Sequence, residues 1–441
     1  MTVRAFAVLV VVLAIALPTR AGPPLLSLPA VIDRALANNP GLMVERLEVD
    51  RADAEQQAAR GGRWPNLDLT AGATQYGYPT FVHGIRELGV FPPLDDTINE
   101  LGISLRLPIY TGGKLTTSIA IAELGTGIAR ERERLGRQEL VFNVSSVYFK
   151  IQQLESLKAA YQARIASLQS QERRVQLLRD AGRAAKLDQL RITGQLTKAR
   201  YDLLQIENRA REARTVLHQL MGEKSPQQAV SLTRYAVLAP AGELSRDVAT
   251  LALRPDLRIA EGQLATAVGR EKLARAERYP ALSLVSGYRE RSGDAWQFYE
   301  DWNVGLQVTL PLFDGGVRRV RIDQATLARR QAEQAIAQTR LEADRQSENA
   351  WHARAEAAAR LSVTDTSVAE AGEVLVIEQL KLEQGVGVVT DVLSAETAVL
   401  TAQADRLQAE FDLIVTGIDL LRANGSLDVA GVQRLIATDT P

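Results

Sequence analysis

The chain has 441 residues, a formal net charge of −1 and no cysteine. Without a basic surplus it lacks the electrostatic footprint of a nucleic-acid-binding protein. The absence of cysteine excludes a disulfide scaffold, a cysteine-ligated zinc or iron–sulfur site and a lipid attached through cysteine. Three histidines, His83, His218 and His352, lie far apart in the sequence. We therefore expect no metal, no other cofactor and no histidine-based catalytic site.

Residues 1–21 have the composition of a secretory signal peptide. Arg4 precedes an unbroken apolar run from Ala5 to Leu17, and small residues follow near Ala21. The run has 13 residues (17 − 5 + 1), whereas a membrane-spanning helix needs ~20. The mature protein is therefore expected to begin near residue 22 and to work outside the cytoplasm.

Two helices are predicted to follow the signal peptide. Ser27 and Pro29 mark a helix start, with apolar residues at helical spacing after them. Asn39-Pro40 interrupts this helix. A second helix is predicted from Leu42 to about Ala59, and Gly61-Gly62 is expected to supply positive-φ positions at its exit.

Alternating apolar and polar residues predict a β-hairpin at about residues 64–109 and a second at about 280–312. In the first, Leu67 and Leu69 alternate with polar residues, which is the period of a strand with one apolar face. Such alternation also fits a half-buried sheet of a soluble protein. Three of the four tryptophans and several tyrosines lie in or beside the two hairpins, and aromatic residues at strand ends favour the lipid-facing wall of a membrane barrel.

Each strand hairpin leads into a long helical hairpin, at about residues 113–222 and 316–425. Both stretches lack proline and are rich in Ala, Gln, Arg, Glu and Leu. A single helix over residues 114–181 would reach ~100 Å, and its apolar residues step by threes and fours as in a coiled coil. Gly125, Gly127 and Gly136 within this helix are expected to mark close approach of a neighbouring helix or a change of supercoil.

The chain is a tandem duplication. Residues 107–113 (Leu-Pro-Ile-Tyr-Thr-Gly-Gly) recur as 310–316 (Leu-Pro-Leu-Phe-Asp-Gly-Gly), an offset of 203 (310 − 107). Upstream, Trp64-Pro65 recurs as Tyr279-Pro280 at an offset of 215 (279 − 64). The first copy therefore carries 12 extra residues (215 − 203), which indicates a lengthened loop between its two strands.

The duplication predicts the domain boundaries and the junction residues. We expect a first repeat at 22–222, a connector at 223–243, a second repeat at 244–425 and a C-terminal tail at 426–441. Asp95 and Asp96 are expected in an external loop formed by the insertion. Each copy of the repeated motif marks the junction between a strand and a long helix, and the predicted junction residues are Pro108, Gly112, Gly113, Pro311, Gly315 and Gly316.

These features together resemble the TolC-like outer membrane efflux proteins, the outer membrane factor family, over essentially the whole mature chain. The marks are the duplicated junction motif, the opening segment 27–42, and Gly385 followed by Asp391-Val392-Leu393. The resemblance implies an all-α, long coiled-coil helical barrel joined to a transmembrane antiparallel β-barrel in a homotrimer. Each chain would contribute four of twelve strands, and four strands alone are too few to close a barrel.

The resemblance also implies a function. It describes a channel in the cell outer membrane that extends into the periplasm and is the exit duct of a tripartite efflux pump or a type I secretion system. Its partners would be outer membrane lipid, a periplasmic adaptor and an inner-membrane transporter. Such a duct is passive and no enzyme, in agreement with the absence of a phosphate-binding loop.

Two other functions compete with the channel. A periplasmic coiled-coil adaptor or scaffold would explain the helical hairpins, but not four amphipathic strands flanked by aromatic residues. A secreted hydrolase would need a nucleophile motif or clustered histidines and acids, which the sequence does not contain.

In the family that the chain resembles, aspartates just past the helical tips line the narrowed aperture. Asp188 and Asp391 are at the matching positions, where carboxylates repeated about a three-fold axis would attract cations. The alternative role for each is a helix N-cap, and both roles can hold. The tips are expected to contact the adaptor through Gly182, Arg183, Ala184, Gly385, Val386 and Gly387.

Overall fold

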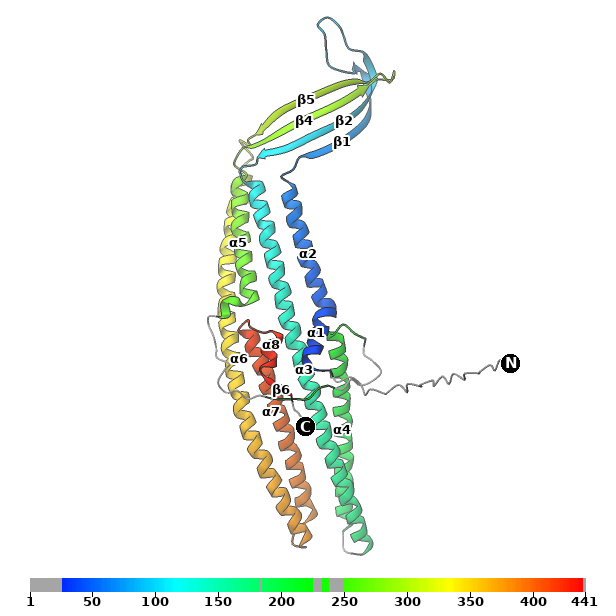
Figure 1. Ribbon diagram of the computed structural model, residues 1–441, viewed down its shortest axis with the longest axis vertical. Helices are drawn as coiled ribbons and strands as arrows, with labels where there is room; N and C mark the ends of the chain where they lie inside the picture. Colours follow the sequence, from blue (N-terminus) through cyan, green and yellow to red (C-terminus); the bar gives the residue numbers. More distant parts are fainter. Residues whose placement is uncertain (1–25, 183–184, 225–231, 238–249, 439–441) are drawn as a thin grey trace, which may run out of the picture.

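The structure is a computed structural model that describes residues 26–182, 185–224, 232–237 and 250–438. The molecule is elongated, with a β-sheet at one end and the tips of two helical hairpins at the other (Figure 1). The predicted signal peptide lies outside the described residues, as do Arg183, Ala184 and most of the predicted connector.

The helices repeat in length as the duplication requires. The third and sixth helices each have 67 residues, the fourth and seventh each have 35, and the second and fifth each have 22. None of the helices in the described part of the chain is long and apolar enough to cross a membrane. The helices are α1 (Leu28–Asn38), α2 (Pro40–Gly61), α3 (Lys114–Asp180), α4 (Lys186–Leu220), α5 (Pro255–Ala276), α6 (Val317–Glu383), α7 (Val389–Ala423) and α8 (Val429–Gln433), with a 3-10 turn η1 (Thr250–Leu253).

The same contact fastens the end of each helical hairpin in both repeats. Nδ2 of Asn39, the N-cap residue of α2, donates to the carbonyl of Leu220 at 2.8 Å. Nη1 of Arg254, the N-cap residue of α5, donates to the carbonyl of Ala423 at 2.7 Å. These bonds satisfy carbonyls that the ends of α4 and α7 leave without helical partners, so the two repeats share their tertiary contacts as well as their sequence.

The sheet contains one hairpin from each repeat. Its strands are β1 (Asn66–Phe81), β2 (Leu94–Tyr110), β4 (Ala281–Ser292) and β5 (Tyr299–Thr309), all antiparallel in the order β1-β2-β4-β5. β1 and β5 are therefore edge strands whose outer backbone groups have no strand partner within the described chain.

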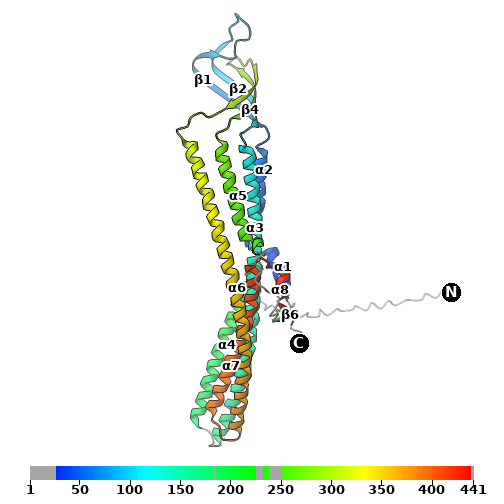
Figure 2. The same cartoon turned by 90° about the vertical axis from the view of Figure 1, so that its left-hand side faces the viewer.

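A small second sheet lies about halfway along the molecule, beside α1 and α8 on one side of the long helices (Figure 2). It pairs β3 (Tyr235–Val237) with β6 (Ile436–Thr438). Neither strand was predicted from the sequence, because three-residue strands are too short to show a period of two.

Two other expectations from the sequence are wrong. Asp95 and Asp96 lie in β2 and not in a loop, because β2 continues outward to Leu94. Gly61 is the last residue of α2, and the C-cap Gly62 has a φ of −60°, so neither glycine supplies the expected positive φ.

The main core surrounds the small sheet, where α1, α3 and α7 meet. Leu28, Val31, Val144 and Ile418 are fully buried there. The hydroxyl of Tyr148 lies 2.6 Å from the carbonyl oxygen of Thr233 and 3.0 Å from that of Leu26, and burial raises the pKa of this hydroxyl. The connector and the N-terminal segment are thus fixed to α3 by a polar contact inside an apolar cluster.

Candidate functional site

One face of the four-stranded sheet is largely apolar, and its side chains are exposed on the edge strands and partly exposed on the central ones. Leu69 of β1 is 70% exposed and Leu306 of β5 is 66% exposed. Side chains of the same face continue across β2, where Leu101 and Ile103 are also exposed. Soluble proteins rarely expose so continuous an apolar surface, whereas a membrane-spanning barrel turns this face to lipid.

The opposite face of the sheet is polar. Glu100 of β2 accepts a hydrogen bond from Nε of Arg291 at 2.8 Å, and Nη1 of Arg289 lies 3.9 Å from its other oxygen. In the central part of this face, Asp68, Glu100 and Asp301 are matched by Arg106, Arg289 and Arg291, and the strand period adds Asp96 toward the outer end of β2. A barrel built with this face inward would have a water-filled interior in which the strand charges nearly cancel.

Aromatic residues mark the boundary between the sheet and the helices. Trp64 and Tyr279 precede β1 and β4 at equivalent positions of the repeats. Tyr110 is the last residue of β2, and its equivalent Phe313 follows the end of β5. All four side chains are exposed, from 50% at Tyr110 to 89% at Phe313. Exposed aromatic side chains at one level of a barrel are typical of a lipid–water interface.

The predicted junction residues lie at this boundary. Pro108 is still within β2, whereas Pro311 follows the end of β5. Gly112 and Gly113 have φ values of 64° and 84°, and Gly315 and Gly316 have 69° and 85°. These left-handed conformations require glycine and redirect the chain from the strand into α3 and α6.

Two further residues of the same junctions, Thr111 and Asp314, were not predicted from the sequence. Thr111 Oγ1 accepts a hydrogen bond from the amide of Leu115 at 3.2 Å. Its equivalent, Asp314, accepts from the amide of Arg318 at 3.0 Å and from Arg318 Nε at 2.7 Å. The Arg318 side chain holds the pKa of the Asp314 carboxyl below its ordinary value. The available signal was a Thr or Asp three residues before the first residue of each long helix, Lys114 or Val317.

The two helical tips lie together at the far end of the molecule (Figure 1). Gly182 and Gly385 turn the chain with φ values of 73° and 78°. Val386 is exposed, and Gly387 packs its backbone against Lys381. The exposed residues at the described part of the tips thus include Gly182, Gly385 and Val386 together with the charged Asp180 and Glu383.

Asp188 and Asp391 occupy the same position in their helices. Each is the third residue of its helix, α4 or α7, and the N-cap residues are Ala185 and Val388. The N-cap alternative is therefore wrong, although a carboxylate in the first turn still complements the helix dipole. Nη1 of Arg191 lies 3.9 Å from the Asp188 carboxylate, whereas Asp391 is exposed and forms no ion pair within the described residues.

A buried polar contact that was not predicted from the sequence joins the two helical hairpins above the tips. Oε1 of Glu396, on α7, accepts hydrogen bonds from Ser167 Oγ at 2.8 Å and Gln171 Nε2 at 2.5 Å, both on α3. Leu393 of α7 packs beside it in an apolar cluster with Leu168. A glutamate within a long polar helix carries no sequence signal that it faces another helix.

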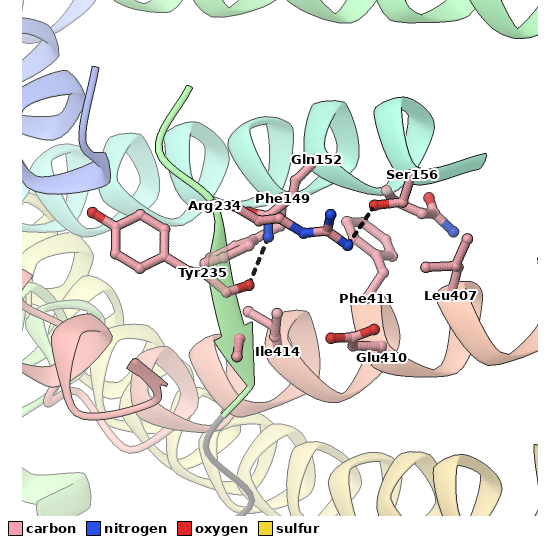
Figure 3. A pocket seen from close by; sticks show the side chains of 11 residues that line it. Phe149, Gln152, Ser156, Arg234, Tyr235, Leu407, Glu410, Phe411 and Ile414 are labelled. Atoms are coloured by element: carbon pink, nitrogen blue, oxygen red, sulfur yellow. Dashed lines mark hydrogen bonds between the residues drawn. The ribbon is translucent and has the colours of Figure 1, made fainter. Parts of the chain in front are cut away.

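A pocket between α3, α7 and β3 is shown in Figure 3. Gln152 Nε2 donates to the carbonyl of Tyr235 at 2.6 Å, and Arg234 Nη2 donates to Ser156 Oγ at 3.3 Å. The remaining walls include Phe149 and Phe411. These bonds fasten the connector strand to α3, so both donors take part in holding the fold together.

Within the described residues, one group of carboxylates could hold a metal ion: Asp95, Asp96 and Asp294 at the outer end of the sheet. The histidines do not join it. His218 is buried beside Glu223, whereas His83 stacks on Tyr299.

A four-stranded sheet with two open edges, one lipid-compatible face and long helical hairpins beneath it defines the class of outer membrane channel subunits. The sequence model of the family described as outer membrane efflux protein matches residues 31–223 and 248–426. Over 404 residues the chain is 24% identical to the solvent efflux pump outer membrane protein SrpC of Pseudomonas putida, an alignment that covers 90% of this chain and 84% of SrpC.

Two further comparisons concern one relative. The cation efflux system protein CusC of Escherichia coli strain K12 is 26% identical over 317 residues, covering 68% of this chain and 65% of CusC. A solved structure of CusC superimposes with a TM-score of 0.79 at 22% identity, covering 91% of this chain and 92% of that structure.

The chain belongs to the outer membrane efflux protein family. It is an outer membrane channel component that extends into the periplasm, and the adaptor alternative is excluded. The predicted fold, long helices joined to a β-barrel segment of four strands, is confirmed.

Proposed function

We propose that three copies of the chain form a passive exit duct of an efflux pump, with a twelve-stranded barrel in the outer membrane. The observation that supports this proposal most directly is the sheet, which has two unpaired edges, an apolar face and a polar face. Four strands are too few to enclose a lumen, whereas twelve fall within the range of known membrane barrels. Closure of a ring also removes the two edges, which would otherwise promote aggregation.

The assembly is tested by the mass of the protein in detergent. We expect a trimer that resists SDS at room temperature and migrates as a monomer after boiling, because closed barrels unfold only on heating. A monomer or dimer that is soluble without detergent would contradict the proposal.

The partners proposed for this duct are a periplasmic adaptor and an inner-membrane transporter. SrpC and CusC are named as parts of efflux systems, one for solvents and one for cations, so the feature they share is the duct and not the cargo. The proposed adaptor contacts are the tip residues Gly182, Arg183, Ala184, Gly385, Val386 and Gly387. Energy would come from the transporter, and the duct itself would catalyse no reaction.

The aperture is proposed to lie at the tips, lined by Asp188 and Asp391. Both belong to first helical turns at the end of the molecule farthest from the sheet. Since positive and negative side chains nearly balance on the polar face of the sheet, the aspartates at the tips would dominate the selectivity of the pore.

We also propose the division of the chain into two repeats, 22–222 and 244–425, joined by a connector at 223–243 and followed by a tail at 426–441. The family model matches in two stretches that fall within or close to these repeats. The junction residues Pro108, Gly112, Gly113, Pro311, Gly315 and Gly316 would then divide the barrel from the helices in each repeat.

A further inference from the structure

α3 packs on α5 in a helix–helix contact, called here the α3–α5 seam, whose equivalent in the other repeat is not formed within the described chain. α3 and α5 lie side by side within the chain. A Cβ added to Gly262 of α5 would lie 2.7 Å from Cγ1 of Ile128, and one added to Gly269 would lie 2.8 Å from Cγ1 of Ile121. The glycines therefore let two isoleucines of α3 approach the α5 backbone closely.

The duplication identifies the counterpart of this seam. α6 is equivalent to α3 at the offset of 203, and α2 is equivalent to α5 at the offset of 215. The equivalents of Ile121 and Gly269 are Gln324 of α6 and Ala54 of α2, and both are exposed. α2 and α6 lie at opposite edges of the helical layer, separated by α3 and α5 (Figure 1), so one chain cannot bring them together.

We propose that a second copy of the chain supplies α2 to the free face of α6, in the register that the α3–α5 seam prescribes. Gln324 then lies opposite Ala54 of the partner subunit, and Gln331 lies opposite Leu47 of the partner subunit. This inference rests on the proposed trimer and adds to it the residues that meet and their order.

The sheet supports the same register independently. β2 and β4 pair with Arg106 opposite Val285 and Ser104 opposite Gly287. Shifted by the two offsets, these pairs become Thr309 of β5 opposite Thr70 of the partner subunit, and Gln307 opposite Gly72 of the partner subunit. All of these residues lie on the polar face. A slip by one residue in the pairing of β5 with β1 of the partner subunit would place polar side chains among lipid-facing ones. The register given by the offsets keeps the polar side chains of both strands on one face.

The two equivalent junction glycines, Gly112 and Gly315, differ in whether a neighbouring side chain covers them. Gly112 is covered within the chain, since a Cβ added there would lie 2.6 Å from Cβ of Tyr279. At the equivalent Gly315, no atom of the described residues comes within 4 Å of such a Cβ. Trp64, the equivalent of Tyr279, is exposed. In the proposed seam, Trp64 of the partner subunit covers Gly315.

Cysteine cross-linking tests the register, and the natural chain has no cysteine to interfere. The double variant A54C/Q324C of the full chain, oxidised in its membrane, is expected to give covalent dimers and trimers on a non-reducing gel. The equivalent positions of α3 and α5 nearly touch, so these cysteines should reach the ~4 Å Cβ separation of a disulfide. L47C/Q331C provides a second pair with the same expectation.

Two controls separate the register from the assembly. A54C/Q331C is displaced by one heptad, ~10 Å along the helix, and should not cross-link. I121C/G269C should form a disulfide within one chain and leave it a monomer on the gel. A trimer that cross-links through A54C/Q331C but through neither matched pair would overturn the register alone. A monomeric mass in detergent without any cross-link between chains would overturn the assembly as well.

Discussion

The two aperture aspartates are not electrostatically equal. Arg191 faces Asp188 at 3.9 Å, whereas Asp391 forms no ion pair within the described residues. We predict that Asp391→Ala lowers the cation-over-anion permeability ratio of single channels more than Asp188→Ala does. A unit charge ~7 Å from an ion in water changes its energy by about 0.6 kcal/mol, or about threefold in the ratio, and the change should be largest at low salt.

The permeability ratio is measured from reversal potentials in a salt gradient. Asp419→Ala, on α7 far from the tip and already paired with Arg422, provides the matched control and should leave the ratio unchanged. A double variant at 188 and 391 with the ratio of the natural protein would contradict the proposed aperture.

Asp314 stabilises the second junction in a pH-dependent manner. Its folded pKa is lowered by the hydrogen bonds from Arg318, so its stabilisation is fully present above the ordinary carboxyl pKa of 3.8 and is lost as the pH falls through the lowered folded value. We predict that Asp314→Ala lowers the midpoint of thermal unfolding at pH 6 but has a smaller effect near pH 3.

Thr111 is the matched control for that experiment. It accepts the equivalent amide hydrogen bond but does not titrate, so Thr111→Ala should lower the midpoint by a similar amount at both pH values. A pH-independent effect of Asp314→Ala would show that the carboxylate charge is unimportant at this junction.

At the scale of the element, the two faces of β5 should respond oppositely to charge. Leu306 lies on the apolar face and its neighbour Gln307 on the polar face. We predict that Leu306→Arg destabilises the barrel by about 2–4 kcal/mol, the cost of an arginine facing lipid near the bilayer midplane. Gln307→Arg should change stability by no more than about 0.5 kcal/mol.

Urea titration of the protein in lipid vesicles measures both variants. Equal destabilisation would mean that both faces are in contact with lipid or that neither is, and either result would contradict the assignment of the lipid-facing side.

Helices and strands could be predicted from the sequence where the spacing of apolar residues stays regular over the whole element. Residues 114–180 could be assigned to one helix because proline is absent and apolar spacing continues, and the turns at Gly182 and Gly385 were visible as glycines between helical runs. Asp95 was misplaced because β2 starts without alternation. Close helix approach or a change of supercoil was expected at Gly125, Gly127 and Gly136. A Cβ added to Gly136 would lie 3.6 Å from Cγ of Glu45 on α2, whereas no atom of the described residues lies within 4 Å of one added to Gly125 or Gly127. The contacts of Gly262 and Gly269 with α3 were not predicted, because a glycine's neighbour is a tertiary property.

At the scale of the molecule, the duplication explains both the predicted features and the missed ones. A motif repeated at a fixed offset predicts equal helices, one strand hairpin per repeat and equivalent junctions. The contact between Glu396 and Ser167 crosses from one repeat to the other, and no internal symmetry reveals such a contact. The same limitation applies to the small sheet, which pairs the connector with the end of the chain.

The exit duct is the central claim, and single-channel recording in a planar lipid bilayer tests it most directly. Purified protein of trimeric mass should insert and give discrete, uniform current steps, because a ring of three protomers encloses a continuous water-filled lumen. The same trimer inserted in the bilayer without any conductance, in the absence of adaptor and at every voltage tested, would contradict a passive duct.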